Sequence, residues 1–194
     1  WQWLAATTNQ TLLARTGALF LGEPDSAYVR DTHRTLTATG ISAEWLEPSA
    51  LAQRYPQIAV EGLGPCVYEP HAGVIRARAA VQTLVAHLMA NRRVLLVTAR
   101  VVPLDEQRGR VEVTTTGGAV LEADAFVFAC GPWLPRVLPQ AVGERVRPTR
   151  QEVLFFGPPA GDLSSSASRL PVWIDFTAGL YGIADLDARG FKVG

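Results

Sequence analysis

The feature that most constrains this chain is one long helical pattern followed closely by several strand-like runs. Residues 76–89 carry apolar side chains at helical spacing with few helix breakers, which predicts a helix. An alternating stretch at 110–121 turns back at Gly117-Gly118 and predicts a hairpin. Continuous apolar runs predict further strands at 94–97, 101–104 and 125–129. A helix, a strand, a meander and a closing strand in this order are typical of an α/β domain.

Shorter strand-like runs surround this unit on both sides. We expect a surface helix over 25–39 that ends at Gly40. The remaining strands are predicted at 16–22, 64–70, 147–156, 172–176, 180–183 and 191–194. Because 147–156 alternates between apolar and polar residues and the last three runs are joined by tight turns, we expect a mixed, largely antiparallel sheet. The fold class is therefore mixed α/β.

Composition excludes several classes of function. Eighteen basic residues balance eighteen acidic ones, so we expect no nucleic-acid partner and no anionic membrane. The sequence has no apolar stretch near the roughly 20 residues that span a bilayer. Two cysteines argue against a disulfide scaffold, and His33, His71 and His87 lack metal-ligand spacing. The chain starts at Trp1, shows no signal peptide and ends in a strand-like run, so we expect an internal piece of a longer cytoplasmic protein.

Seven short motifs occur in an order and spacing that carry a family resemblance. They are Thr16-Gly17-Ala18-Leu19, Tyr68-Glu69-Pro70-His71-Ala72-Gly73-Val74, Thr98-Ala99-Arg100-Val101, Ala129-Cys130-Gly131-Pro132-Trp133, Arg147-Pro148-Thr149-Arg150-Gln151, Leu180-Tyr181-Gly182 and Phe191-Lys192-Val193-Gly194. With them the chain resembles the FAD-dependent amine oxidases of the D-amino acid oxidase superfamily. The closest group is that of monomeric sarcosine oxidase and N-methyltryptophan oxidase.

The resemblance implies a two-domain flavoprotein. Residues 1–72 and 146–194 would form parts of a substrate domain, and 73–145 would form the later half of the FAD-binding domain. The implied reaction oxidises the C–N bond of an amino acid, N-methylated or otherwise a secondary amine, to an imine, with O2 reduced to H2O2. The sequence has no Gly-x-Gly-x-x-Gly phosphate loop. We therefore expect FAD in the full-length protein, whereas this segment alone is expected to be inactive and need not hold the cofactor.

Two residues match the family's catalytic positions. Lys192 corresponds to a lysine that faces the flavin and helps to activate O2, because a fixed positive charge stabilises the superoxide formed by the first electron transfer. The alternative is a lysine that points outward from an alternating strand. Tyr181 matches a tyrosine of the substrate pocket, where its hydroxyl would orient substrate or water; the alternative is a core tyrosine. Val172, Trp173 and Ile183 could line the same pocket, although core packing is the simpler interpretation for each.

Four residues are cofactor-side candidates by the same resemblance. Val101 would offer backbone groups near the adenosine, and Gly131 would allow the backbone to approach the cofactor closely. Cys130 and Trp133 belong to the same motif; Cys130 is interpreted as a small buried thiol rather than a nucleophile. Arg76, in the first turn of the long helix, could meet a phosphate, but a solvated position is the simpler interpretation.

Two rival functions remain open. The same fold serves flavin dehydrogenases that pass electrons to a carrier other than O2, and Lys192 favours the oxidase over them. A non-catalytic module that retains the fold without FAD is the third possibility, which the missing phosphate loop would favour if Trp1 were the natural start.

Overall fold

The computed structural model describes residues 1–90, 94–104 and 112–194. The chain divides into two compact units, the first made of 1–91 and 152–194 and the second of 92–151. The predicted three-part division, with boundaries at residues 72 and 145, stays a prediction, since compactness alone does not reveal what a unit binds.

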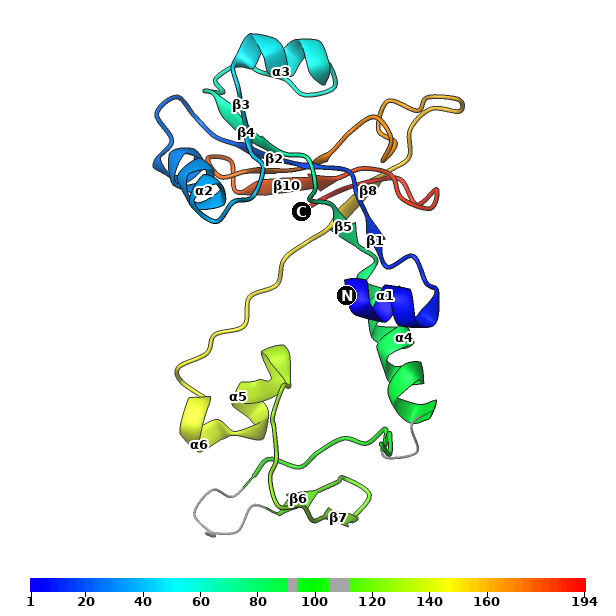
Figure 1. The fold of residues 1–194 in the computed structure, drawn as a ribbon. Coiled ribbons are helices and arrows are strands. Elements are labelled where there is room, and N and C mark those ends of the chain that lie inside the picture. Colours follow the sequence, from blue (N-terminus) through cyan, green and yellow to red (C-terminus); the bar gives the residue numbers. More distant parts are fainter. Residues whose placement is uncertain (91–93, 105–111) are drawn as a thin grey trace. The chain divides into compact units, whose positions relative to one another are not determined.

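The first unit is built on a seven-stranded mixed sheet (Figure 1). Strands β2 and β9 run parallel, and the other neighbouring pairs are antiparallel. In spatial order the strands are β3 (Glu44–Leu46), β4 (Cys66–Glu69), β2 (Ala18–Leu21), β9 (Val172–Asp175), β10 (Leu180–Ile183), β11 (Phe191–Val193) and β8 (Leu154–Phe156). The prediction of a mixed α/β fold with a mixed sheet is confirmed.

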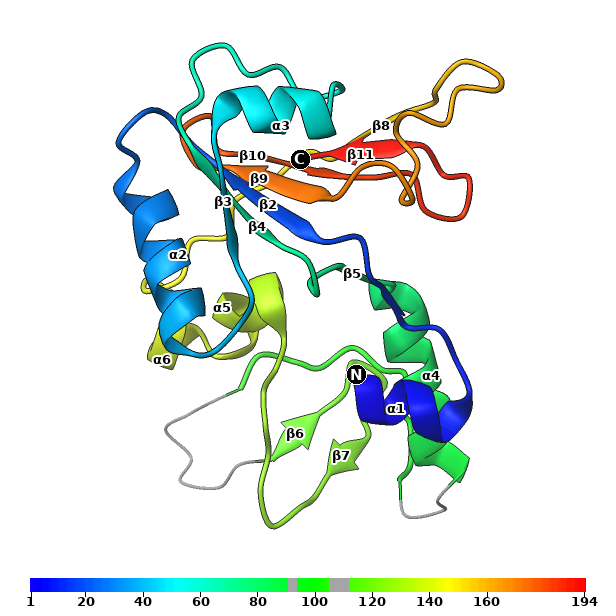
Figure 2. The ribbon, with the colours of Figure 1, turned by 45° about the horizontal axis from the view of Figure 1, so that its top comes forward.

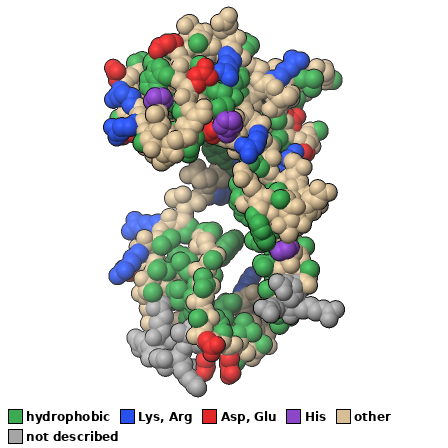
Figure 3. Space-filling model, in the orientation of Figure 1, with side chains coloured by type: hydrophobic (Ala, Val, Ile, Leu, Met, Phe, Trp, Pro, Cys, Tyr) green, Lys and Arg blue, Asp and Glu red, His purple; other side chains and the backbone are tan. Residues whose placement is uncertain are grey.

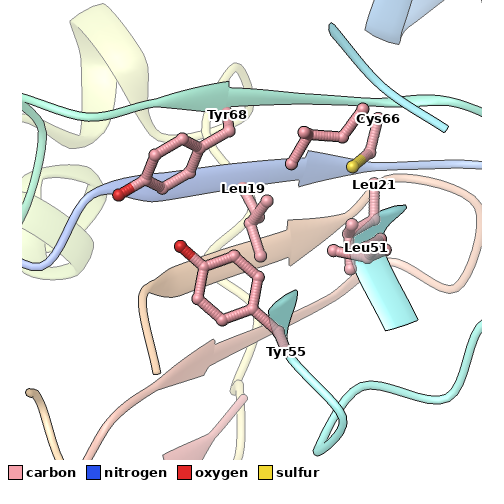
Figure 4. Close-up of a cluster of buried hydrophobic side chains, with 7 residues drawn as sticks. Leu19, Leu21, Leu51, Tyr55, Cys66 and Tyr68 are labelled. Carbon is pink, nitrogen blue, oxygen red and sulfur yellow. The ribbon is translucent and has the colours of Figure 1, made fainter. Parts of the chain in front are cut away.

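The apolar core lies on one face of this sheet, because successive side chains of a strand point to opposite faces. Helix α3 (Pro48–Arg54) covers this face and inserts Leu51, as Figures 2 and 4 show. Leu19, Cys66 and Tyr68 from the central strands pack against it. Leu19 and Cys66 are fully buried, so Cys66 is a core residue. The apolar core described here therefore uses one of the two faces of the sheet.

The two predicted helices are present. Helix α2 (Ala27–Ala38) starts after Ser26, whose hydroxyl accepts a hydrogen bond from the Val29 N–H, and Gly40 follows its end with a left-handed φ of 73°. Helix α4 (Ala77–Ala90) packs on α1 (Gln2–Thr8) through a small cluster that includes Leu4 and Ala80. A two-stranded ribbon of β1 (Leu13–Ala14) and β5 (Val74–Ile75) joins these helices to the sheet.

The second unit contains the predicted hairpin and a helical segment. Strands β6 (Val113–Thr114) and β7 (Val120–Leu121) pair antiparallel, and the turn closes where the Gly118 N–H donates to the Thr115 carbonyl. Part of the predicted hairpin, 110–111, lies outside the described residues. The chain then forms η2 (Gly131–Trp133), α5 (Leu134–Val137) and α6 (Pro139–Val142).

Three predicted strand segments, 94–97, 101–104 and 125–129, are not strands, although Val101 forms a single bridge to Thr115. Residues 94–97 and 125–129 form no strand, and Leu95 and Val127 are 86% and 93% exposed. A continuous apolar run is typical of a strand buried between neighbours, but no described residue pairs with these runs, so nothing fixes them as strands. Hydrophobic side chains are accordingly visible over much of the second unit's surface (Figure 3). The predicted strand 147–156 is confirmed only at its end, in β8.

None of the described helices is long and apolar enough to cross a bilayer.

Candidate functional site

Lys192 lies at the centre of β11, between two paired strands. Its register partners are Ile183 of β10 and Phe155 of β8. Directly paired residues project on the same face of a sheet, so these three side chains share one face. Leu19 pairs with Trp173, which in turn pairs with Gly182, the neighbour of Ile183. Lys192 therefore lies on the face opposite the apolar core.

Lys192 is also unusual in the sequence as a whole. It is the only lysine of the chain, in which all other cationic side chains are arginine or histidine. The side chain is half-buried, and within the described part of the chain no carboxylate forms an ion pair with it. An ammonium without a partner charge keeps its full field available for an external group.

Tyr181 is the aromatic neighbour of this ammonium. The Lys192 Nζ lies 5.0 Å from the centroid of the Tyr181 ring, within the range of a cation–π contact. Tyr181 precedes Ile183 by two residues on β10, so both side chains point to the same face. The Tyr181 N–H and carbonyl bond the backbone of Gly194 at 2.9 and 3.2 Å, which fixes the pairing of this hairpin. The structure thus brings the two predicted catalytic residues together.

The sheet register separates this pair from the neighbouring core. Gly182 leaves room for the Trp173 indole, which a Cβ at this position would overlap. Trp173 packs against the buried cluster around Leu19, whereas Ile183 faces the other way. The core interpretation is therefore confirmed for Trp173, and Ile183 instead belongs to the surface that carries Lys192.

A cavity of about 480 Å³ opens beside Lys192. It lies within the first unit, between the start of α4, strand β5 and the loop that joins β10 to β11. Ile183 and Phe155 give it an apolar wall, and Arg76, Arg78, Arg189 and Lys192 give it a cationic rim that contains Asp187. An apolar wall with a few convergent charges is typical of a small-molecule site.

Arg76 and Asp187 form a two-point ion pair at the edge of this cavity. The Arg76 Nη2 and Nε donate to the two carboxylate oxygens of Asp187 at 2.8 and 3.1 Å. These hydrogen bonds hold the pKa of the Asp187 carboxyl below its usual value of 3.8 and raise the pKa of Arg76. Arg76 is therefore partly exposed, as the solvated interpretation expects, but its guanidinium is held in an ion pair rather than free in solvent. Residues so far apart in the chain gave no sequence signal of this contact.

The four cofactor-side candidates belong to the second unit. Val101 forms a single bridge to Thr115. Gly131 has a left-handed φ of 52°, and no atom lies within 4 Å of the place that a Cβ would occupy. Trp133 is 63% exposed. Cys130 is half-buried rather than buried as predicted, because the run before it forms no strand, and its carbonyl accepts a hydrogen bond from the Trp133 N–H. Their assignment to a cofactor stays a prediction.

Within the described residues no group of His, Cys, Asp or Glu side chains could hold a metal ion. The geometry supports the cavity beside Lys192 as the candidate site, and its lining suits a small organic molecule.

Comparison with known proteins places these features in context. A family model described as FAD dependent oxidoreductase matches residues 1–194. The N-methyl-L-tryptophan oxidase of Yersinia pestis (strain Pestoides F) is 26% identical over 139 residues, which are 72% of this chain and 37% of that protein.

Two solved structures share the fold over the whole chain. The L-proline dehydrogenase from P. horikoshii superposes with a TM-score of 0.72 at 15% identity, and the iminodiacetate oxidase from Chelativorans sp. BNC1 with a TM-score of 0.70 at 19% identity. In each case the match covers 100% of this chain and 52% of the other. The chain thus spans about half, or less, of the length of these relatives.

Proposed function

Since the chain belongs to the FAD dependent oxidoreductase family, we propose that the full-length protein oxidises the C–N bond of an amino acid with FAD as cofactor and O2 as electron acceptor. The observation that carries this proposal is the position of Lys192. Its ammonium stands beside a cavity with an apolar wall, on the sheet face opposite the core and without a carboxylate partner among the described residues.

The residues of the first unit fit the ring of a flavin. A fused aromatic ring system needs a flat apolar surface, which the sheet face offers at Ile183 and Phe155. The open backbone at Gly131, in the second unit, suits close approach of a polar cofactor group. The sequence contains no glycine-rich phosphate loop, so the diphosphate has no dedicated binding loop in these residues.

The chemistry divides between cofactor and protein. FAD, when bound, would accept the two electrons and the hydrogen that leave the carbon next to nitrogen as the C–N bond becomes a double bond, and water would then hydrolyse the resulting imine. The Lys192 ammonium stabilises negative charge that develops on O2, an effect that is large in a site of low dielectric. The Tyr181 hydroxyl orients the amine or a water molecule, while its ring holds the ammonium in place.

The substrate is proposed to be an amino acid, with secondary or N-methylated amines as the first class to test. The names of the relatives support this class, since they include oxidases of N-methyl-L-tryptophan and of iminodiacetate. We propose a cytoplasmic location for the protein.

A flavin dehydrogenase is the second candidate. It is favoured by one fold neighbour, which is named a dehydrogenase of L-proline. An unpaired ammonium in the site favours the oxidase, because a dehydrogenase does not need to stabilise charge on O2.

The test uses the full-length protein, purified without added cofactor. We expect a yellow protein with a flavin absorption spectrum that releases H2O2 with at least one member of a panel of N-methylated and unmodified amino acids. Dye reduction by an amino acid without O2 consumption would assign the dehydrogenase instead. A colourless protein that cannot be loaded with FAD would contradict both.

A further inference from the structure

The cavity beside Lys192 has a second structural feature, which is the ion pair that closes its edge. Arg76 is the residue immediately before α4, and Asp187 lies in the loop between β10 and β11. Two hydrogen bonds join them, at 2.8 and 3.1 Å, so the guanidinium plane is fixed relative to the carboxylate. The Arg76 side chain is 25% exposed, which makes it the more sheltered partner.

Hydrogen bonds hold the backbone of Arg76 in place. Its N–H donates to the Leu12 carbonyl at 2.9 Å, and its own carbonyl accepts the first helical hydrogen bond from Ala80 at 2.8 Å. Ala80 and Leu12 are both buried in the cluster between α1 and α4. The guanidinium therefore extends from a backbone that is held on both sides.

Asp187 is at the tip of the loop that leads to Lys192. Asp187 and Ala188 have left-handed φ values of 61° and 55°, and Gly190 follows at 88°. The base of the loop is held by Asp185, whose Oδ1 accepts from the Gly190 N–H at 3.0 Å. Two described contacts tie the tip to other elements: the hydrogen-bonded pair of Asp187 with Arg76, and the Arg189 guanidinium, which lies 5.5 Å from the centre of the Phe155 ring of β8; the pair with Arg76 is the one that joins the tip to α4.

Lys192 follows this loop directly, two residues after Gly190. The tip and the ammonium are therefore close along the chain, so a shift of the tip would act first on the start of β11, which carries Lys192. A shift of about 1 Å would alter the contact between the Lys192 ammonium and the Tyr181 ring. Misplacement of a functional group on this scale can lower the rate of a catalytic step about 100-fold.

We propose that the Arg76–Asp187 ion pair is a positioning device that sets the place of the Lys192 ammonium in the cavity by tying α4 to the β10–β11 loop. This proposal rests on the function proposed above for Lys192. It also explains the charge arrangement, because Asp187 neutralises Arg76 and leaves Lys192 as the unpaired cation nearest Tyr181. Arg76 and Asp187 are positioning residues and take no part in the chemistry.

The first experiment measures the place of Lys192 without relying on bound cofactor or on activity. An amine-selective acylating reagent is applied to the full-length protein, and modification of Lys192 is followed by mass spectrometry of the peptide that trypsin releases after Arg189. Variants R76Q and D187N remove the pair from either side. The charge-swapped double variant R76D/D187R restores it in reverse, and R76K keeps the charge but loses the two-point contact.

We expect R76Q and D187N to speed acylation of Lys192 by up to about fivefold, the range in which a partly exposed ion pair shifts an equilibrium. The double variant should return toward the rate of the unmodified protein, and R76K should lie between. The matched control is R34Q, which removes the exposed Arg34–Asp31 pair of α2 at 3.0 Å and should leave the rate unchanged.

The second experiment separates positioning from general stability. In the flavin-loaded enzyme, R76Q and D187N should lower kcat/KM for O2 by about tenfold or more while KM for the amine changes little, because only the ammonium is displaced. Thermal unfolding of each variant identifies any that fails to fold, and the double variant and R76K then carry the test.

Unchanged acylation of Lys192 in both R76Q and D187N, or an equal change in R34Q, would overturn the positioning proposal. The same holds if the double variant folds and fails to restore the rate. Failure of the proposed function gives a different result, since the acylation pattern would appear as expected while the protein consumed no O2 with any amine.

Discussion

Replacing Leu19 by alanine tests the division of the sheet into a core face and a free face. Leu19 lies on the central strand β2, is 0% exposed and packs among Leu51 and Tyr68. The substitution removes three carbons, which at about 0.8 kcal/mol each cost about 2.4 kcal/mol in lost burial. The cavity left behind raises the expected loss in the free energy of unfolding to about 3–4 kcal/mol.

The matched control is Ile183→Ala, which removes the same number of carbons from the opposite face. Ile183 is only half-buried and borders the cavity, so we expect a loss of about 1 kcal/mol or less. Urea titrations followed by tryptophan fluorescence give both values in the full-length protein. Equal losses for the two variants, or a smaller loss for Leu19→Ala, would refute the assignment of faces and with it the free surface around Lys192.

Three further predictions concern the core. Burial, and then a hydrogen bond with Tyr68, raises the pKa of Tyr55 from 10.0 to about 12. The contribution of the neutral Tyr55 side chain to stability is therefore complete below pH 10 and is lost as the pH rises to 12. In unfolding titrations, the stability of Tyr55→Phe should depend less on pH over this range. Burial raises the pKa of the Cys66 thiol to about 11, so iodoacetamide at pH 8 should modify it, as read by mass spectrometry, only after unfolding. Gly182→Ala should cost about 1–3 kcal/mol in a urea titration, because the new methyl group overlaps the Trp173 indole; an unchanged urea midpoint would contradict this packing.

Sequence patterns predicted those elements whose partners are close along the chain. The helix at α4 and the hairpin of β10 and β11 depend on local periodicity and tight turns, and both are present. Tyr181 and Lys192 meet for the same reason, since they lie on adjacent strands of one hairpin.

The features that depend on distant partners were not predictable. The runs at 94–97 and 125–129 have the composition of buried strands, but a strand exists only where a neighbour pairs with it, and composition does not name that neighbour. The Arg76–Asp187 pair joins residues far apart in sequence, neither of which has a distinctive local pattern. Such a contact depends on the tertiary fold, which brings the β10–β11 loop next to the start of α4.

Substitution of Lys192 by methionine tests the central claim most directly, because it removes the charge and keeps a similar apolar length. In rapid-mixing experiments on the full-length protein, we predict that oxidation of the reduced enzyme by O2 slows by about 100- to 1000-fold. Flavin reduction by the amine should change by no more than about threefold, since the substituted group acts on O2. An oxidation rate equal to that of the unmodified protein would contradict the role of Lys192.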